Sequence, residues 1–231
     1  MTTVSKCSQA FYFLITLLFG PLLLAADRVP SLPRAPTALA MNPSEWSVAY
    51  DGYGFVNFDR QSRFVEFAPE AASQLNQTHA ALLLAKKYLQ APIKNFKITV
   101  SVNTERQLRT PKVNPWECFW LFFNYGTDSN GKKMTNYFTL KPNGIELGRA
   151  YEELGQKFLA TAAKPRLVIG ARTKITIENK AGLLKAWVND ILVLSFNSHN
   201  ATVPLFENAG TIGLYTEDAQ VKVETVDVAP I

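Results

Sequence analysis

The fold class follows most directly from the segment Leu184-Lys-Ala-Trp-Val-Asn-Asp-Ile-Leu-Val-Leu-Ser-Phe196. Two apolar-rich runs flank Asn189-Asp190, and both of these residues tolerate the positive φ of a two-residue hairpin turn. Just upstream, Lys174-Ile-Thr-Ile-Glu178 alternates polar and apolar residues with the period of two that a half-buried strand has. The segment from Arg172 to Val228 is therefore predicted to be a run of short antiparallel strands.

Strand-like segments continue upstream of this hairpin, and one more lies at the end of the chain. Asn95 to Asn103 places its apolar residues on one face. Ala80 to Leu89 could form a helix or could hold a continuously buried strand at Ala81 to Ala85, and the surrounding β pattern favours the strand. Val226 to Val228 runs out of phase with Ala219 to Val223 by one residue, which indicates a β-bulge near Glu224-Thr225. Further short strands are expected at 46–50, 54–58 and 63–67.

The middle of the chain has the pattern of a central group of paired strands. Glu117 to Tyr125 is apolar on both faces, as expected for a strand that is covered on both sides. Met134 to Lys141 follows, with Tyr137 on the face opposite its apolar positions. Asn143-Gly144 has the composition of a tight turn, so the next strand should place Glu146 on the same side as Tyr137.

The N-terminus has the order of a secretory signal. Lys6 precedes the apolar run from Phe11 to Leu24, and Ala25-Ala26 supplies the small residues of a cleavage site. The run is short for a membrane span, and Gly20-Pro21 interrupts it. We therefore expect export to a secreted or periplasmic location, with no membrane partner after cleavage.

The rest of the chain divides into two parts by composition. Residues 1–26 are the expected signal peptide, and residues 27–45 contain four prolines without an apolar period, which predicts an extended leader. Residues 46–231 are predicted to form a single β-sandwich domain, a length that can bury a substantial core.

The charge of the chain argues against a nucleic-acid partner. The formal net charge is +5, and the densest basic groups are the isolated pairs Lys86-Lys87 and Lys132-Lys133. Nucleic-acid binders usually concentrate Lys and Arg on one face or arm. We expect these lysines to be solvated surface residues.

Four segments carry a resemblance to a known family, and they end with Gly210-Thr-Ile-Gly-Leu-Tyr-Thr-Glu-Asp-Ala219; the others are 116–125, 136–148 and 184–190. From about Trp46 to Val228 the chain resembles the concanavalin A-like lectin/glucanase (laminin G-like) jelly-roll superfamily, and within it the 3-keto-disaccharide hydrolase (DUF1080) group. The resemblance implies an all-β, antiparallel jelly-roll β-sandwich with a carbohydrate on the concave face of one sheet.

Known catalytic carboxylate patterns of such folds are absent. Retaining glucanases of this superfamily carry Glu-x-Asp-x-x-Glu on one strand, because alternate residues share a face and retention needs carboxyl groups about 5 Å apart. Glu152-Glu153 and Glu217-Asp218 are consecutive and would point to opposite faces. Gln77-Thr-His79 matches the Gln-x-His of jelly-roll polysaccharide lyases, but the partner motifs are missing.

We expect no cofactor and no metal site. The chain has two histidines and no His or Cys cluster, and Cys118 is expected to be a buried, unpaired thiol. Asp128-Ser-Asn-Gly131 begins like a calcium loop but has Thr139 at the position of the bidentate glutamate, so it is interpreted as a turn. A structural calcium held by loop carbonyls is compatible with the resemblance, although no motif specifies it.

A platform for sugar remains as the candidate site, because aromatic rings stack on pyranose rings while polar groups bond the hydroxyls. Trp120 and Trp187 could equally be core residues. The candidate carbohydrate-binding residues are Arg109, Trp116, Trp120, Asn124, Tyr137, Lys141, Glu146, Arg149 and Trp187.

Three functions are compatible with these observations. The leading hypothesis is a secreted domain that binds a poly- or oligosaccharide. The second is a glycoside hydrolase or polysaccharide lyase of the DUF1080-like kind, with Glu146 as acid or base assisted by Tyr137 and Arg149. The third is a structural or adhesion domain with a protein partner.

Overall fold

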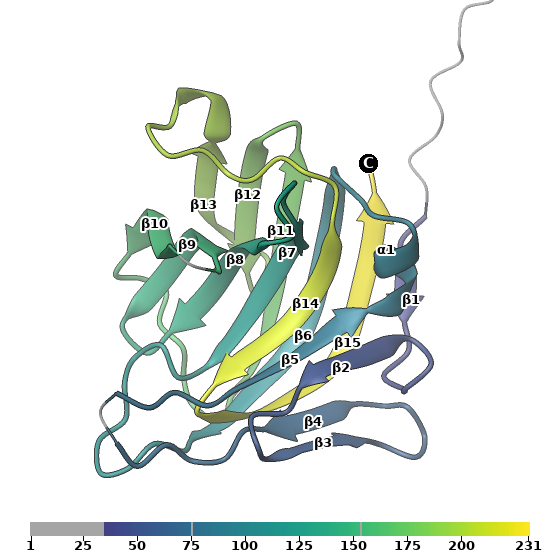
Figure 1. The fold of residues 1–231 in the computed structure, drawn as a ribbon. Coiled ribbons are helices and arrows are strands. Elements are labelled where there is room, and N and C mark those ends of the chain that lie inside the picture. The colour runs from purple at the N-terminus through teal and green to yellow at the C-terminus, as the bar shows by residue number, and fades with distance from the viewer. Residues whose placement is uncertain (1–34, 75, 153) are drawn as a thin grey trace, which may run out of the picture. The chain divides into compact units, whose positions relative to one another are not determined.

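Two antiparallel sheets face each other in the computed structural model, which describes residues 35–74, 76–152 and 154–231 (Figure 1). The described residues belong to one compact unit. The expected signal peptide and the first part of the expected leader lie outside the described residues. No helix among the residues that the structure describes is both long and apolar enough to cross a bilayer.

Each sheet mixes strands from distant parts of the sequence, as a jelly roll requires. Sheet A contains, in spatial order, β13 (Ile191–Asn197), β12 (Leu183–Val188), β11 (Arg172–Lys180), β6 (Phe96–Gln107), β15 (Ala219–Pro230), β4 (Val65–Ala68) and β3 (Phe55–Phe58), with β1 (Thr37–Leu39) paired to β15. Sheet B contains β10 (Gly155–Ala162), β9 (Gly144–Tyr151), β8 (Lys133–Lys141), β7 (Phe119–Thr127), β14 (Thr211–Glu217), β5 (Ala80–Ala85) and β2 (Trp46–Tyr50). The short helix α1 (Lys86–Gln90) follows β5, and the 3-10 turn η1 (Ser198–Asn200) follows β13.

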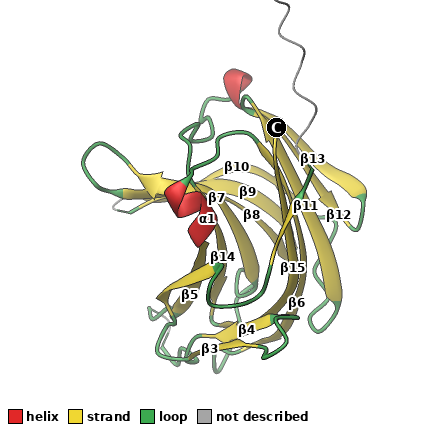
Figure 2. Ribbon diagram, turned by 90° about the vertical axis from the view of Figure 1, so that its right-hand side faces the viewer, coloured by secondary structure: helices red, strands yellow, loops and turns green. Residues whose placement is uncertain are grey.

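The predicted fold class is confirmed. The described residues form an all-β, antiparallel jelly-roll sandwich, and Figure 2 shows its two sheets as separate layers. Asn189 and Asp190 have φ values of 49° and 67° and join β12 to β13, so the deciding hairpin forms as the sequence predicts. The ladder between β15 and β6 shifts register between Val223 and Thr225, where the bulge was expected.

The core lies between the two sheets. The alternating apolar residues of β6, from Phe96 to Val102, are buried against the inward side chains of β7. The rings of Phe96 and Phe123 meet across the layers with their centroids 5.6 Å apart. Burial of such side chains is the main favourable term in the folding free energy.

The domain begins earlier than the composition indicates. Residues 37–39 form β1, and Thr37 pairs with Val228 of β15. Leu39 and Met41 are buried in the core, and the Trp46 indole donates a hydrogen bond to the Ala40 carbonyl at 3.2 Å. The prediction of a leader that extends to residue 45 is therefore wrong for its described part. A three-residue strand is too short to show a period of two, so β1 could not be predicted from the pattern of residues.

Candidate functional site

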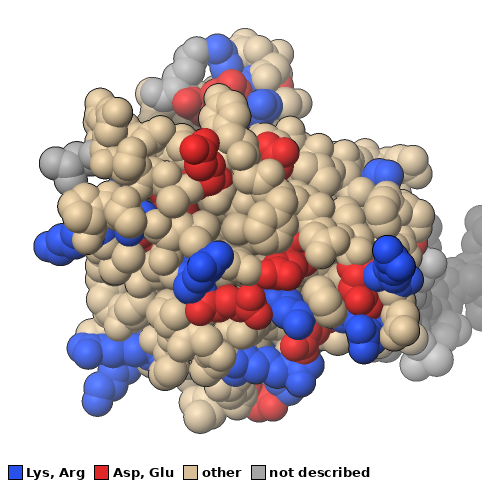
Figure 3. All heavy atoms as spheres, turned by 90° about the horizontal axis from the view of Figure 1, so that it is seen from below, with Lys and Arg blue, Asp and Glu red and all other residues tan. Residues whose placement is uncertain are grey.

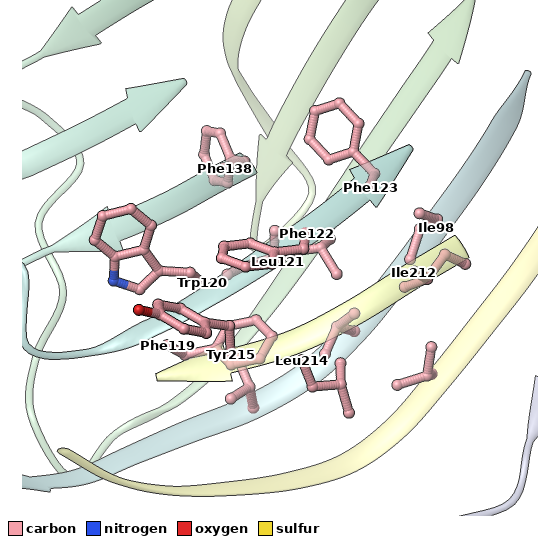
Figure 4. Packing of buried hydrophobic residues seen from close by; sticks show 14 of the residues in the cluster. Ile98, Phe119, Trp120, Leu121, Phe122, Phe123, Phe138, Ile212, Leu214 and Tyr215 are labelled. Atoms are coloured by element: carbon pink, nitrogen blue, oxygen red, sulfur yellow. The ribbon is translucent and has the colours of Figure 1, made fainter. Parts of the chain in front are cut away.

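The outer face of sheet B gathers aromatic side chains. Trp120 and Phe122 alternate with the core residues of β7, and the pairing register sets Trp120 opposite Tyr215 of β14 and Phe122 opposite Tyr137 of β8. We call this outer face of sheet B the aromatic face. Figure 4 shows Trp120, Phe122 and Tyr215 together on β7 and β14.

The rings of the aromatic face pack directly against one another. Phe122 and Tyr215 are stacked with centroids 4.4 Å apart, and Trp120 lies 4.7 Å from Tyr137 in a tilted arrangement. Contacts of this kind stabilise by about 0.5–1.5 kcal/mol beyond the area that they bury. The aromatic face is therefore a fixed surface rather than a set of free side chains.

Two adjoining cavities open on the aromatic face. The larger has a volume of about 380 Å³, with Trp120, Phe122, Tyr137 and Tyr215 among its walls. The smaller has a volume of about 260 Å³. Trp120 and Gln156 line both cavities, which makes them neighbours. The smaller cavity is lined by Trp116, Trp120, Lys141, Glu146, Gln156, Phe158 and Glu217.

The exposed aromatic rings of the two cavities come from Trp116, Tyr50 and Phe158. Trp120 is only 2% exposed, so it forms the wall between the cavities and offers little free surface. Trp116 is 42% exposed, Tyr50 is 42% exposed and Phe158 is 64% exposed. The Trp120 indole donates a hydrogen bond to the Trp116 carbonyl at 2.8 Å, which fixes the backbone of this rim residue. Tyr50, Phe158 and Gln156 were not predicted as site residues.

Glu146 is held by two neighbours on the aromatic face. The Tyr137 hydroxyl donates a hydrogen bond to Glu146 Oε1 at 2.8 Å, and Lys141 Nζ forms an ion pair with Glu146 Oε2. Burial, followed by the nearby Glu146 charge, raises the pKa of Tyr137, so this phenol remains a neutral donor. The sequence-based expectation that Glu146 and Tyr137 share a face agrees with this geometry.

Glu217 is a second carboxylate on the aromatic face, and sequence reasoning missed it. The Tyr215 hydroxyl donates a hydrogen bond to Glu217 Oε1 at 2.6 Å. Burial is the largest cause that raises the pKa of Glu217, and the charges of Asp218 and Glu117 raise it further. The sequence feature that could have identified Glu217 is its two-residue spacing from Tyr215, which puts both side chains on one face of β14.

Arg109 lies outside the aromatic face, in a buried ion-pair network. Its guanidinium pairs with Glu117, donates to Asp218 Oδ2 at 2.7 Å and donates to the Gln74 carbonyl at 2.9 Å. Its side chain is only 4% exposed, and both carboxylates are fully buried. These contacts occupy the donors that a sugar would need, so the prediction of Arg109 as a binding residue disagrees with its placement.

Asn124 and Arg149 also face away from the cavities. Asn124 has a φ of 52° at a register shift in β7, and its amide donates to the Asn208 carbonyl at 2.8 Å. Arg149 is three residues from Glu146 and therefore on the opposite face of β9. Its guanidinium donates to the Pro204 carbonyl at 2.8 Å and lies 4.7 Å from the Phe206 ring centroid. The expectation that Arg149 assists Glu146 is therefore wrong, because the two side chains lie on opposite faces of β9.

Trp187 belongs to the other sheet. It lies on β12 of sheet A, where Lys97 Nζ is 5.8 Å from its ring centroid. Sequence alternation identified an outward-facing tryptophan but could not assign the strand to a sheet. The structure thus brings together five predicted residues, Trp116, Trp120, Tyr137, Lys141 and Glu146.

The Gln-x-His motif does not contribute to either cavity. Gln77 and His79 contact each other at 2.7 Å, and His79 Nδ1 lies 2.9 Å from the Glu70 carbonyl. Asp128 closes a turn, because its Oδ1 accepts hydrogen bonds from the backbone of Asn130 and Lys132. Among the described residues, no group of three or more His, Cys, Asp or Glu side chains could hold a metal ion.

Charges of both signs lie on the surface. In Figure 3, Lys and Arg are interspersed with Asp and Glu over the face that is shown. The charged residues that line the two cavities are the lysines Lys133 and Lys141 and the glutamates Glu146, Glu152 and Glu217. A field of one sign that would attract a polyanion is therefore not built into the cavities.

Solved structures with the same two-sheet arrangement cover most of this chain. The fold is that of the concanavalin A-like lectins and glucanases. The carbohydrate binding module CBM66 from Bacillus subtilis is 12% identical with a TM-score of 0.55, and the match covers 80% of this chain and 95% of that one. A β-glucanase from Bacillus licheniformis is 9% identical with a TM-score of 0.54, covering 85% and 98%. The exoplasmic/lumenal domain of VIP36, solved with Ca²⁺ and Man3GlcNAc, is 9% identical with a TM-score of 0.54, covering 86% and 91%.

These similarities concern the fold alone. No family model matches the sequence, and no curated protein matches it either. The predicted fold is confirmed, whereas membership of the superfamily and the narrower resemblance to the 3-keto-disaccharide hydrolase group stay predictions. The function has to be argued from the aromatic face itself.

Proposed function

We propose that this protein is exported and binds a poly- or oligosaccharide on the aromatic face. The observation that carries the proposal is the pair of adjoining cavities that share Trp120 and Gln156. A cavity of about 380 Å³ lies in the size range of small-molecule sites, roughly 300–1,000 Å³. The smaller cavity of about 260 Å³ adjoins it, and two neighbouring cavities suit a ligand made of repeated rings.

The chemistry of the lining suits sugar hydroxyls and sugar ring faces. Trp116 and Phe158 present partly exposed rings at the smaller cavity, and Tyr50 does so at the larger one. Glu146 and Lys141 supply an acceptor and a donor that are already oriented by their ion pair. Because carboxylates outnumber lysines in the lining, a neutral glycan is favoured over an anionic one.

The three similar structures support the same ligand class by their names. One is a carbohydrate binding module, one is a β-glucanase and one was solved with a mannose-containing oligosaccharide. The shared fold makes a sugar ligand a reasonable first choice for testing, and the lining of the cavities gives the specific reason.

A thermal-shift screen against neutral and acidic glycans tests the proposal. A ligand at 100 times its Kd should stabilise the protein by about 2.7 kcal/mol. Trp116→Ala should then weaken binding by about tenfold, the equivalent of about 1.4 kcal/mol, through the loss of ring stacking. Trp187→Ala is the matched control, because Trp187 lies on sheet A and should leave the affinity unchanged.

Two outcomes would count against sugar binding. If no glycan stabilises the protein, the adhesion hypothesis with a protein partner replaces it. If Trp116→Ala and Trp187→Ala weaken binding equally, the ligand does not sit on the aromatic face. Export is tested separately by the N-terminal sequence of the secreted protein, which should begin at or next to Asp27.

A further inference from the structure

Two carboxylates enter the smaller cavity from different strands. Glu146 lies on β9 and Glu217 on β14, and both side chains line the cavity together with Trp116 and Trp120. In sheet B, β8 and β7 lie between β9 and β14. The three strand spacings set the backbones about 14 Å apart, so the side chains face the cavity from two sides.

The two carboxylates have different surroundings. Glu146 is ion-paired with Lys141, which supplies the counter-charge that an ionised carboxylate needs inside a protein. Glu217 has no lysine or arginine bonded to it among the described residues, and its one bonded partner is the neutral Tyr215 hydroxyl. Burial opposes ionisation at Glu217 and raises its pKa.

We propose that Glu217 and Glu146 act as general acid and general base in the hydrolysis of a glycosidic bond that lies in the smaller cavity. This inference rests on the proposed function, because a bound glycan is the substrate. A carboxylate held by a lysine and a second, buried carboxyl group without such a partner, both lining one cavity, are the combination that acid–base cleavage of a glycosidic bond uses.

The reaction balances with water as the co-reactant. Glu217 donates its proton to the bridging oxygen, the bond between the anomeric carbon and this oxygen breaks, and the oxygen leaves as a hydroxyl group. Water attacks the anomeric carbon from the opposite side and gives its proton to Glu146. Proton exchange with solvent then restores both carboxyl groups.

The spacing of the strands favours inversion at the anomeric carbon. Retaining enzymes need their carboxyl groups about 5–5.5 Å apart, whereas inverting enzymes need about 6.5–9.5 Å to leave room for water. Residues on one strand or on paired strands would give the shorter distance. Glu146 and Glu217 are separated by two intervening strands, which favours the longer distance.

The test combines binding with product analysis on the same samples. The purified protein is incubated with each glycan that gave a thermal shift, and released sugars are followed by chromatography and by proton NMR of the anomeric signals. We expect new reducing ends whose first-formed anomer is inverted. Glu217→Gln and Glu146→Gln should each lower turnover by about 10²–10⁴-fold while the thermal shift by the glycan persists.

Glu178→Gln is the matched control, because Glu178 pairs with Lys97 on sheet A, away from the cavity, and its loss should leave turnover unchanged. Binding without products would overturn the catalytic proposal and leave the binding proposal intact. Products with retained configuration, or full turnover in either cavity variant, would also overturn it. Absence of binding to every glycan would overturn both.

Discussion

Gly148 and Tyr137 face each other across the β8–β9 pair, and the phenol ring of Tyr137 occupies the space that a side chain at Gly148 would need. A Cβ atom at Gly148 would lie 2.3 Å from both Cζ and Oη of Tyr137. Because Tyr137 donates a hydrogen bond to Glu146, the missing side chain at Gly148 positions a carboxylate of the cavity.

Gly148→Ala should therefore disturb the site as well as the packing. Overpacking of this kind typically costs about 1–3 kcal/mol, and the displaced Tyr137 would lose its hydrogen bond to Glu146. We expect lower stability in urea and a weaker thermal shift by the glycan. Gly126→Ala is the control on β7, because its Cβ would lie 3.4 Å from Asn208 Nδ2 and 4.0 Å from the Ala209 carbonyl oxygen, which are ordinary contact distances.

Arg109→Met should be among the most destabilising single changes in the domain. The substitution leaves Glu117 and Asp218 buried without their counter-charge, which typically costs about 3–5 kcal/mol. Urea unfolding measures the loss. Arg63→Met breaks the exposed ion pair with Asp59 and should shift the midpoint very little. Equal losses in the two variants would contradict the assigned role of Arg109.

The part of the site that could be predicted is the part that depends on strand alternation, in which every second side chain lies on the same face. The alternation of β8 and the turn at Asn143-Gly144 were enough to put Tyr137 and Glu146 on one face. The same rule, applied carefully, separates Arg149 from Glu146, because residues three apart on a strand point to opposite sides. Glu217 was passed over with Asp218 as one acidic pair, although only Glu217 shares a face with Tyr215.

The remaining errors concern information that a single strand does not contain. Trp187 alternates as outward-facing residues do, but the assignment of β12 to sheet A depends on pairing with β11, a tertiary event. Arg109 became buried because Glu117 and Asp218, distant in sequence, compensate its charge. Fold class was predictable because turns and alternation are local signals.

Cys118 should be inert in the folded protein. It is a buried free thiol whose Sγ lies 3.2 Å from Thr139 Oγ1, and burial raises its pKa to about 12. The thiolate is the reactive form, so iodoacetamide at pH 8 should label this residue only after unfolding. Mass spectrometry of the peptide that contains Cys118 measures the extent of labelling. Rapid labelling of the native protein would show that the segment that precedes β7 opens in the folded state.

Glu217→Gln should stabilise the protein at neutral pH while it lowers the proposed turnover. The ordinary pKa near 4.5 is raised in the folded state, mainly by burial, so the unfolded chain releases this proton at a lower pH than the folded one. Between the two pKa values the folded state binds more protons, and the free energy of unfolding falls as pH rises. Below about pH 4 this carboxyl group is protonated in both states and contributes nothing to the slope.

The neutral amide removes this penalty, so the difference in Tm between variant and parent should be small at pH 4 and should grow in favour of the variant towards pH 8. Thermal unfolding at several pH values measures it. A change in the hydrogen bond from Tyr215 would shift the difference in Tm by the same amount at every pH and would leave its dependence on pH unchanged. A pH-independent difference would mean that Glu217 ionises as easily in the fold as in the unfolded chain, and it would then be unsuited to serve as the acid.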